Sequence, residues 1–176
     1  MPPDDVELRR VFGHFATGVA VVTAQSGEGR AGVTVNSFSS LSLKPPLVLF
    51  SLTRSLRSLP VFLEAGRIGI NILAAGQRDI SHRFATMGAD KWADTPLSVG
   101  PHGAILIDDA LAHLECERHE AVDGGDHVIL ICRVLDVRAN PGDPLMFYRG
   151  GYLPESGGRG GSTLGRSADR VTRARS

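Results

Sequence analysis

Hydroxyl and amide side chains gather in one stretch of the sequence, residues 32–52, which reads GVTVNSFSSLSLKPPLVLFSL. The polar groups lie between two apolar runs and are carried by Thr34, Asn36, Ser37, Ser39, Ser40 and Ser42. Such a segment offers many hydrogen-bonding groups and backbone amides with almost no net charge. A flat polar heterocycle with a sugar-like chain needs a surface of this kind. Taken alone, however, a serine-rich segment is more often a turn than a ligand site.

A second polar segment, residues 51–58, joins the end of an apolar run to a predicted helix start. It carries Ser51, Arg57 and Ser58. Helix-start amides together with arginine and serine side chains form a ready phosphate site. The ordinary alternative is that Ser58 only caps the helix and that Arg54 and Arg57 are solvated charges.

Two further polar pieces lie at the ends of apolar runs. Gly125-Asp126-His127 is a turn that carries one ionisable ring into a strand, and residues 148–152 read YRGGY, in which two glycines permit close approach of a backbone to a ligand. His127 alone would be a histidine that pins a turn, and Tyr148 and Tyr152 alone would close the core. The four pieces complement one another as parts of one ligand site. Together they supply a polar surface, a phosphate-binding segment, one histidine and aromatic side chains to cover the ligand.

Several familiar catalytic and metal motifs are absent from the sequence. It contains no G-x-x-x-x-G-K and no G-x-G-x-x-G after a strand, which argues against a P-loop or a Rossmann nucleotide site. It contains no G-x-S-x-G elbow, and Cys116-x-x-His119 lacks a second ligand pair nearby. We therefore expect no metal site.

Short apolar runs separated by turn signals predict a mainly β fold. The expected helices start at Asp4, with Glu7 completing a capping box and Thr17-Gly18 ending the helix, at Ser58 (to Gly66) and at Asp79 (to Ala85). The expected strands are 19–24, 31–35, 47–52, 68–73, 111–118, 127–137 and 145–148, with 86–104 as a loop and Gly150-Gly151 ending regular structure. Since helices and strands do not alternate, the pattern favours an antiparallel barrel of six or seven strands with short peripheral helices.

Length and charge favour one domain with a tail of different composition. The 176 residues carry 19 basic and 19 acidic side chains, a formal net charge of zero, so no global field favours nucleic acid. Residues 156–176 are rich in Gly, Ser and Arg, and we expect them to be a disordered tail after a domain at 1–155. No apolar run reaches the ~20 residues of a membrane helix, and the first residues lack a signal-peptide pattern, so we expect a cytoplasmic protein. Cys116 and Cys132 are then expected to be buried free thiols.

Five separated motifs resemble the flavin reductase family, the small NAD(P)H-dependent reductases that serve two-component monooxygenases. They read ATGVAVVTA, GVTVNSFSSLSLKPPLVLFSL, INILAAGQRDISHRFA, GGDHVIL and PLMFYRGGY, and they span about residues 8–153 in the family's order. The resemblance implies a split β-barrel of the FMN-binding type that pairs as a homodimer. It also implies FMN or FAD, and NADH or NADPH, as the nucleotides.

The resemblance assigns roles to residues of this chain. It places Thr34, Val35, Asn36 and Ser37 along the isoalloxazine edge, and it places Ser39, Ser51, Arg57 and Ser58 near the ribityl chain and phosphate. Phe84 and Tyr152 would border the ring, and His127 would orient nicotinamide. The implied activity is hydride transfer from NAD(P)H to flavin, which then leaves reduced for a partner monooxygenase. The alternatives are a protein that holds FMN tightly for electron transfer and a flavin-binding module without catalysis. A third alternative gives the main function to the Arg-rich tail, as a docking segment for nucleic acid or an acidic partner.

Overall fold

Antiparallel strands make up most of the chain in the computed structural model, which describes residues 2–154. The helical elements are α1 (Asp5–Phe12), α2 (Leu59–Glu64), the 3-10 turn η1 (Ala75–Gln77) and α3 (Arg78–Ala85). The strands are β1 (Thr17–Gly18), β2 (Ala20–Ser26), β3 (Gly29–Val35), β4 (Ser39–Leu43), β5 (Pro46–Thr53), β6 (Ile68–Ile72), β7 (Leu97–Val99), β8 (Ile105–Ile107), β9 (Ala112–Gly124), β10 (His127–Ala139), β11 (Met146–Tyr148) and β12 (Gly151–Tyr152). The predicted tail, 156–176, and the first and last residues of the predicted domain lie outside the described residues.

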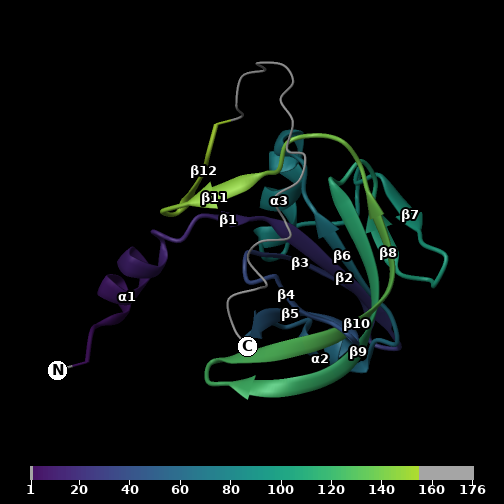
Figure 1. The fold of residues 1–176 in the computed structure, drawn as a ribbon, viewed down its shortest axis with the longest axis horizontal. Coiled ribbons are helices and arrows are strands. Elements are labelled where there is room, and N and C mark those ends of the chain that lie inside the picture. The colour runs from purple at the N-terminus through teal and green to yellow at the C-terminus, as the bar shows by residue number, and fades with distance from the viewer. Residues whose placement is uncertain (1, 155–176) are drawn as a thin grey trace.

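The main sheet has seven strands in the order β3-β2-β6-β9-β10-β5-β4, and all of its pairings are antiparallel (Figure 1). The mainly β, antiparallel prediction is therefore confirmed. Within residues 2–154 the end strands β3 and β4 do not pair with each other, so hydrogen bonding leaves the sheet open. Smaller sheets join β1, β11 and β12, and β7 with β8.

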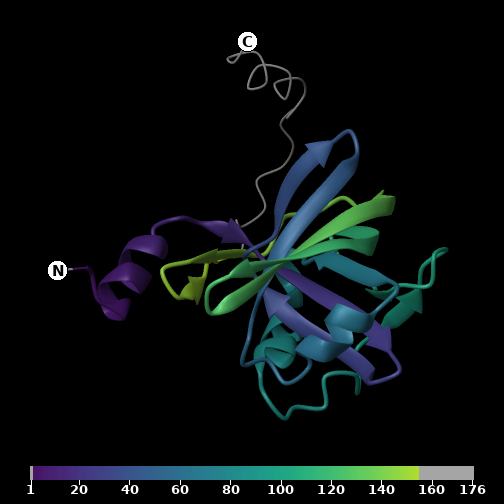
Figure 2. The same cartoon turned by 90° about the horizontal axis from the view of Figure 1, so that it is seen from below.

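Helix α1 begins as predicted and ends earlier. The Asp4 carboxylate accepts a hydrogen bond from the Glu7 amide at 2.8 Å, which is the expected N-cap, but the helix stops at Phe12 and Thr17–Gly18 forms a strand. Figure 2 shows α1 standing away from the sheets, and none of its residues is buried. The exposed fractions of Phe12 and Phe15 are 68% and 79%, so their apolar surface has no partner within residues 2–154.

Three other predictions of local structure were wrong. Residues 39–43 of the polar segment form an end strand, β4, because strand pairing uses backbone groups and does not require apolar side chains. The expected loop at 86–104 contains β7. Gly150 does not end regular structure, because its positive φ of 83° builds a tight turn from β11 into β12.

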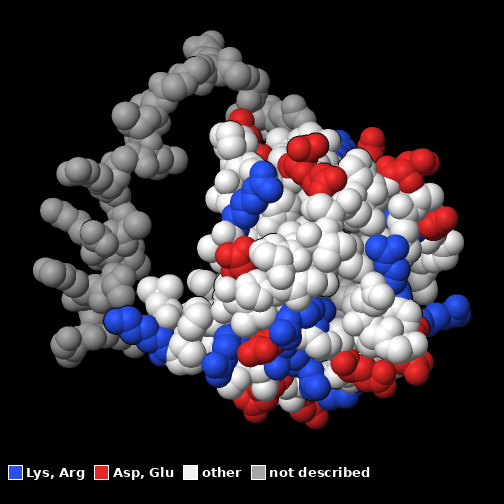
Figure 3. Space-filling view, turned by 90° about the vertical axis from the view of Figure 1, so that its right-hand side faces the viewer, with Lys and Arg blue, Asp and Glu red and all other residues white. Residues whose placement is uncertain are grey.

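Charges of both signs are spread over the face of the molecule seen in Figure 3. Lysine and arginine side chains lie among aspartates and glutamates, with uncharged surface between them.

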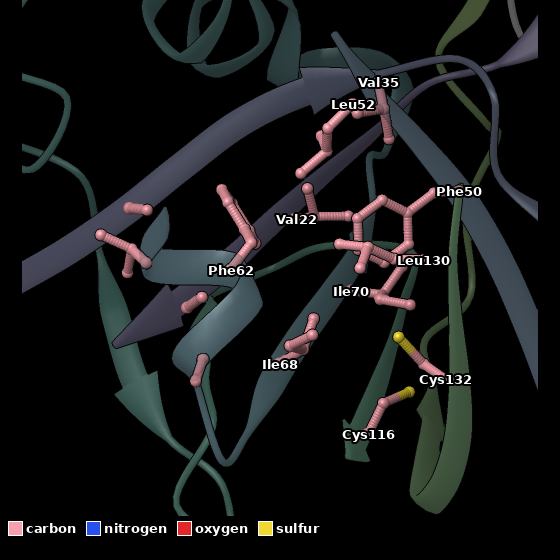
Figure 4. Close-up of a cluster of buried hydrophobic side chains, with 14 of the residues drawn as sticks. Val22, Val35, Phe50, Leu52, Phe62, Ile68, Ile70, Cys116, Leu130 and Cys132 are labelled. Carbon is pink, nitrogen blue, oxygen red and sulfur yellow. The ribbon is translucent and has the colours of Figure 1, made fainter. Parts of the chain in front are cut away.

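Both faces of β2 are buried, which divides the apolar interior into two clusters. Val22 belongs to the larger cluster together with Phe50 and Leu130, whereas its neighbour Val21 belongs to a second cluster. Figure 4 shows the larger cluster, into which Cys116 and Cys132 also point. Both thiols are free and buried, as predicted. Burial raises the pKa of Cys132 to about 12 and raises that of Cys116 as well.

Candidate active site

A hollow of about 230 Å³ lies where β3 and β5 end and β10 begins. We call it the serine hollow. It is lined by Val33, Thr34, Val35, Asn36, Ser37, Ser51, Leu52, Thr53, Leu56 and His127. Residues predicted from three separate parts of the sequence, 34–37, Ser51 and His127, therefore meet at one place.

Strand register explains why these residues meet. In the antiparallel pair of β5 and β10, His127 lies opposite Thr53 and Ile129 lies opposite Ser51. Beyond the end of β3, the Ser37 hydroxyl accepts a hydrogen bond from the Ser51 amide at 2.9 Å and donates one to the Ser51 carbonyl at 3.2 Å. The polar loop is thereby fastened to the end of β5.

A larger hollow of about 520 Å³ borders the same loop on another side. We call it the threonine hollow. Its lining consists of Phe15, Ala16, Thr17, Gly18, Val19, Ala20, Asn36, Ser37, Phe38, Ser39 and Ile72. Asn36 and Ser37 line both hollows, so the two are neighbours across residues 36–37.

Thr17 is the unexpected member of the threonine hollow. Its Oγ1 is buried and has no hydrogen-bond partner within residues 2–154. A buried hydroxyl without a partner is costly, and a ligand with a polar edge would satisfy it. From the sequence, Thr17 was expected only to end a helix, although it lies in the ATGVAVVTA motif that resembles the family.

The hydroxyl of Thr34 is already used inside the protein. It donates to the Ser81 carbonyl of α3 at 2.7 Å, and the Ser81 hydroxyl shares a 2.7 Å hydrogen bond with the Tyr152 phenol. Thr34 and Tyr152 are thus linked through one residue, which ties β3 and β12 to α3. For a ligand, Thr34 offers its methyl group and backbone rather than its hydroxyl.

His127 is oriented by its neighbour in the turn. Its Nδ1 lies 2.7 Å from the Asp126 carboxylate, and this hydrogen bond lowers the pKa of Asp126. The side chain of His127 is 44% exposed and lines the serine hollow. With Nδ1 held by Asp126, Nε2 is the atom left to contact a ligand.

Arg54 fixes the turn that precedes His127. Its guanidinium donates to the Gly125 carbonyl and to the Asp123 carboxylate, both at 2.8 Å. The Arg54 hydrogen bond to the Asp123 carboxylate, followed by one that the Gly125 amide donates to the same carboxylate, lowers the pKa of Asp123. Arg54 therefore acts on the β9–β10 turn and is not a free cation for phosphate.

The other predicted site residues lie away from the two hollows. Phe84 is fully buried and packs edge-on against Trp92, with ring centroids 5.3 Å apart. Tyr152 contacts His82, with ring centroids 5.0 Å apart. Arg57 is exposed and lines neither hollow. The Ser58 side chain makes no capping hydrogen bond.

Ser58 instead lines a third hollow, of about 240 Å³, that the sequence did not reveal. We call it the tryptophan hollow. Its lining consists of Arg30, Ala31, Gly32, Ser58, Ala89, Asp90, Lys91 and Trp92. The Lys91 ammonium donates to the carbonyls of Gly32, at 3.0 Å, and Phe84, at 2.9 Å, and burial lowers its pKa.

The described part of the chain has neither a metal-binding cluster nor a membrane-spanning helix. Residues 2–154 contain no group of three or more His, Cys, Asp or Glu side chains placed to hold a metal ion. Among the same residues, every helix is too short or too polar to cross a bilayer.

Comparison with known proteins gives consistent matches. A family model described as "Flavin reductase like domain" matches residues 12–156. The reductase component of 4-nitrophenol 4-monooxygenase/4-nitrocatechol 2-monooxygenase from Rhodococcus opacus is 40% identical over 151 residues, which cover 86% of this chain and 81% of that protein. The FMN reductase (NADH) SmoA from Agrobacterium fabrum is 43% identical over 145 residues, with coverages of 82% and 83%.

A solved structure agrees with these matches. The NADH:FAD oxidoreductase SgcE6 from Streptomyces globisporus, in complex with NAD and FAD fragments, superposes with a TM-score of 0.81 at 36% identity. The match covers 89% of this chain and 97% of that one.

Proposed function

Because the chain belongs to the flavin reductase family, we propose that it reduces FMN or FAD with NAD(P)H and supplies the reduced flavin to a partner monooxygenase. The observation that carries the proposal is the convergence of residues 34–37, Ser51 and His127 on the serine hollow. The names of the relatives, an FMN reductase (NADH) and an NADH:FAD oxidoreductase, support the choice of nucleotides. We further propose that the fold is of the split β-barrel type.

The residues present fit a flavin. The loop at 36–37 lies between two hollows and brings short polar side chains and backbone groups to both, without a charged side chain in the loop. The unpartnered Thr17 hydroxyl gives the threonine hollow a further donor and acceptor. A ring system with polar edges and an apolar body matches such a set of donors and apolar walls.

The bound nucleotides supply the redox chemistry themselves, as hydride transfer from nicotinamide to flavin. The chain's contribution is to hold the rings, exclude water and stabilise the negative charge that develops on the flavin. Backbone amides at 36–37 are suited to that charge, because they are fixed by the Ser37–Ser51 hydrogen bonds before any ligand arrives. His127, with Nδ1 held by Asp126, offers Nε2 to orient nicotinamide.

Roles also follow for the predicted residues outside the two main hollows. We propose that Phe84 and Tyr152 position the site indirectly, Phe84 by packing beneath Gly32 and Tyr152 through Ser81. Ser39, in the threonine hollow, and Ser58, in the tryptophan hollow, remain candidates for contacts with the ribityl chain and phosphate. For Arg57 we retain the proposed contact with the flavin phosphate, which its exposed side chain would approach from the solvent side.

We also propose a homodimer that covers the exposed apolar side chains of α1 and β4. Phe12 on α1 is 68% exposed and Leu43 on β4 is 89% exposed. Apolar surface of this kind is favourable to bury against a second copy. Sedimentation of the wild-type chain should give twice the mass of the chain, and Phe12→Asp should lower that mass. A monomeric wild type would refute the dimer.

The domain division stays part of the proposal. We place the catalytic domain at 1–155 and assign no part of catalysis to 156–176. A chain ending at residue 155 should therefore keep the flavin reduction rate of the full chain. The proposed cytoplasmic location would keep the two buried thiols reduced.

The experiment that tests the function is NADH oxidation by the purified chain, measured with and without riboflavin, FMN or FAD. We expect oxidation that depends on added flavin. If NADH is not oxidised with any of the flavins, the reductase function is wrong and the alternative of a non-catalytic flavin-binding protein is favoured. Flavin that stays bound through gel filtration would instead favour an electron carrier with a tightly held FMN.

A further inference from the structure

The tryptophan hollow and the serine hollow follow one another along a single strand. Residues 30–32 of β3 line the first, and residues 33–35 line the second. The segment after β5 passes the two hollows in the opposite direction, since Leu56 lines the serine hollow and Ser58, two residues later, lines the tryptophan hollow. With a strand rise of about 3.3 Å per residue, Arg30 lies about 13 Å from Thr34 along β3.

The lining of the tryptophan hollow combines cationic, aromatic and small side chains. The Arg30 guanidinium lies 4.7 Å from the centroid of the Trp92 ring, and Arg30 has no carboxylate partner within residues 2–154. The side chain of Ser58 makes no capping hydrogen bond. One acid is present, Asp90, whose carboxylate accepts hydrogen bonds from the amides of Trp92, at 3.2 Å, and Ala93, at 3.1 Å.

This chemistry suits one half of a dinucleotide. Arginine donates in a planar fork to phosphate oxygens, and purines stack on aromatic rings and on guanidinium planes. A flavin mononucleotide ends at its first phosphate, whereas FAD continues through a second phosphate to adenosine. From a flavin ring in the serine hollow, the second phosphate and adenosine of FAD would extend past Ser58 toward Arg30.

We propose that the tryptophan hollow holds the adenosine diphosphate half of FAD, so that Arg30 selects FAD over FMN. The proposal rests on the proposed function, because it takes the flavin ring to lie beside residues 34–37 with its ribityl chain toward Ser58. Arg30 then donates to the phosphates, and the Arg30–Trp92 pair provides the surface for the adenine ring.

Trp92 makes binding directly measurable, because it is the only tryptophan in the 176-residue sequence. Its fluorescence therefore reports on this hollow without turnover and without NADH. We expect ADP, which does not absorb Trp92 emission, to change that emission saturably. FAD should bind more tightly than FMN in the same titration. An unchanged emission with ADP would overturn the proposal.

Substitution of Arg30 tests its part in selection. Because Arg30 is exposed, Arg30→Ala should fold, and it should weaken FAD binding about tenfold relative to FMN binding, as expected for loss of a hydrogen bond to a charged group. Arg30→Lys should recover part of the preference. Arg118→Ala removes an exposed arginine of β9 outside this hollow and serves as the matched control.

The outcomes also separate this proposal from the proposed function. If Arg30→Ala weakens FAD and FMN equally, the hollow takes the first phosphate and the selection proposal is wrong. If it raises the KM for NADH and leaves the FAD-to-FMN ratio unchanged, the hollow serves the nicotinamide nucleotide and the proposal is again wrong. Selective FAD binding without NADH oxidation would instead refute the reductase function and leave the selection by Arg30 intact.

Discussion

Ser37 and Ser51 form a two-way hydrogen-bonded link, in which one hydroxyl accepts from the Ser51 amide at 2.9 Å and donates to the Ser51 carbonyl at 3.2 Å. The link joins the polar loop after β3 to the end of β5. From the sequence, Ser37 was expected to contact the ligand, whereas in the structure its hydroxyl supports the loop. The loop is thereby held in place before a ligand binds, which reduces the entropy lost on binding.

Ser37→Ala should therefore weaken both folding and flavin binding. The substitution leaves the part-buried amide and carbonyl of Ser51 without this partner, which costs about 1–3 kcal/mol in the free energy of unfolding. Urea denaturation measures that cost, and the KM for flavin should rise as the loop loosens. Ser40→Ala, at an exposed position of β4, is the matched control and should change neither value. Equal behaviour of the two variants would show that the link contributes nothing.

His127→Ala should impair the use of NADH. Loss of the proposed contact between Nε2 and nicotinamide should raise the KM for NADH or lower kcat by about tenfold, the effect of one hydrogen bond to a charged or polar ligand group. Asp126→Asn should have a smaller effect of the same kind, because it weakens the hold on Nδ1 without removing the ring. Steady-state kinetics with varied NADH measure both, with the exposed His119→Ala as control. Unchanged kinetics in His127→Ala would refute the role.

The same pair sets an expectation for pH. The hydrogen bond from His127 lowers the pKa of Asp126, so this carboxylate stays ionised in the folded chain at pH values where an ordinary aspartate begins to protonate. The contribution of the pair to stability is present above the unfolded pKa of about 3.9 and is lost as the pH falls through the lower folded value. A titration of Asp126 by NMR should show its pKa rise in His127→Ala.

Gly32→Ala should destabilise the fold. A Cβ atom at this position would overlap the ring of buried Phe84, with Cδ1 only 2.6 Å away, and would lie 3.2 Å from Trp92. Overpacking of this kind costs about 1–3 kcal/mol, and thermal unfolding should show a Tm lowered by roughly 2–4 °C for each kcal/mol. Gly27→Ala is the control, since a Cβ there meets nothing within 4 Å. A Tm equal to that of the control would mean that Phe84 moves freely.

The two cysteines should be unreactive in the folded protein. Both are buried, and burial raises the pKa of Cys132 to about 12 and raises that of Cys116. Ellman's reagent at pH 8 should detect no thiol in the native chain and two after unfolding, the number in the sequence. Since the unfolded thiols lose protons at lower pH than the folded ones, stability should fall as the pH rises from about 9 toward 12. Rapid reaction of the native chain would contradict this burial.

Much of the sheet could be predicted from the sequence, because apolar runs and turn signals are local. The predicted strands 19–24 and 31–35 correspond to β2 and β3, which pair as an antiparallel hairpin. The end of α1 could not be predicted in this way. Its apolar positions keep a helical spacing as far as Phe15, but the helix has no apolar surface to pack on within residues 2–154 and stops at Phe12.

The candidate site could be predicted where its polar residues directly follow an apolar run. Residues 34–37, Ser51 and His127 were singled out because polar groups followed apolar runs, and strand register then brings them together. Arg30 and Trp92 carried no such signal. They meet only because the loop after α3 folds back across β3, a long-range contact that no local pattern encodes.

Strand β3 is an end strand of the main sheet, and its backbone faces a hazard that the interior strands do not share. Unpaired amides and carbonyls on an end strand can recruit a strand from another molecule and so begin aggregation. Lys91 occupies one of these carbonyls, that of Gly32. The loop that carries Lys91 therefore covers part of the sheet edge, and its detachment would expose β3 as a starting point for aggregation.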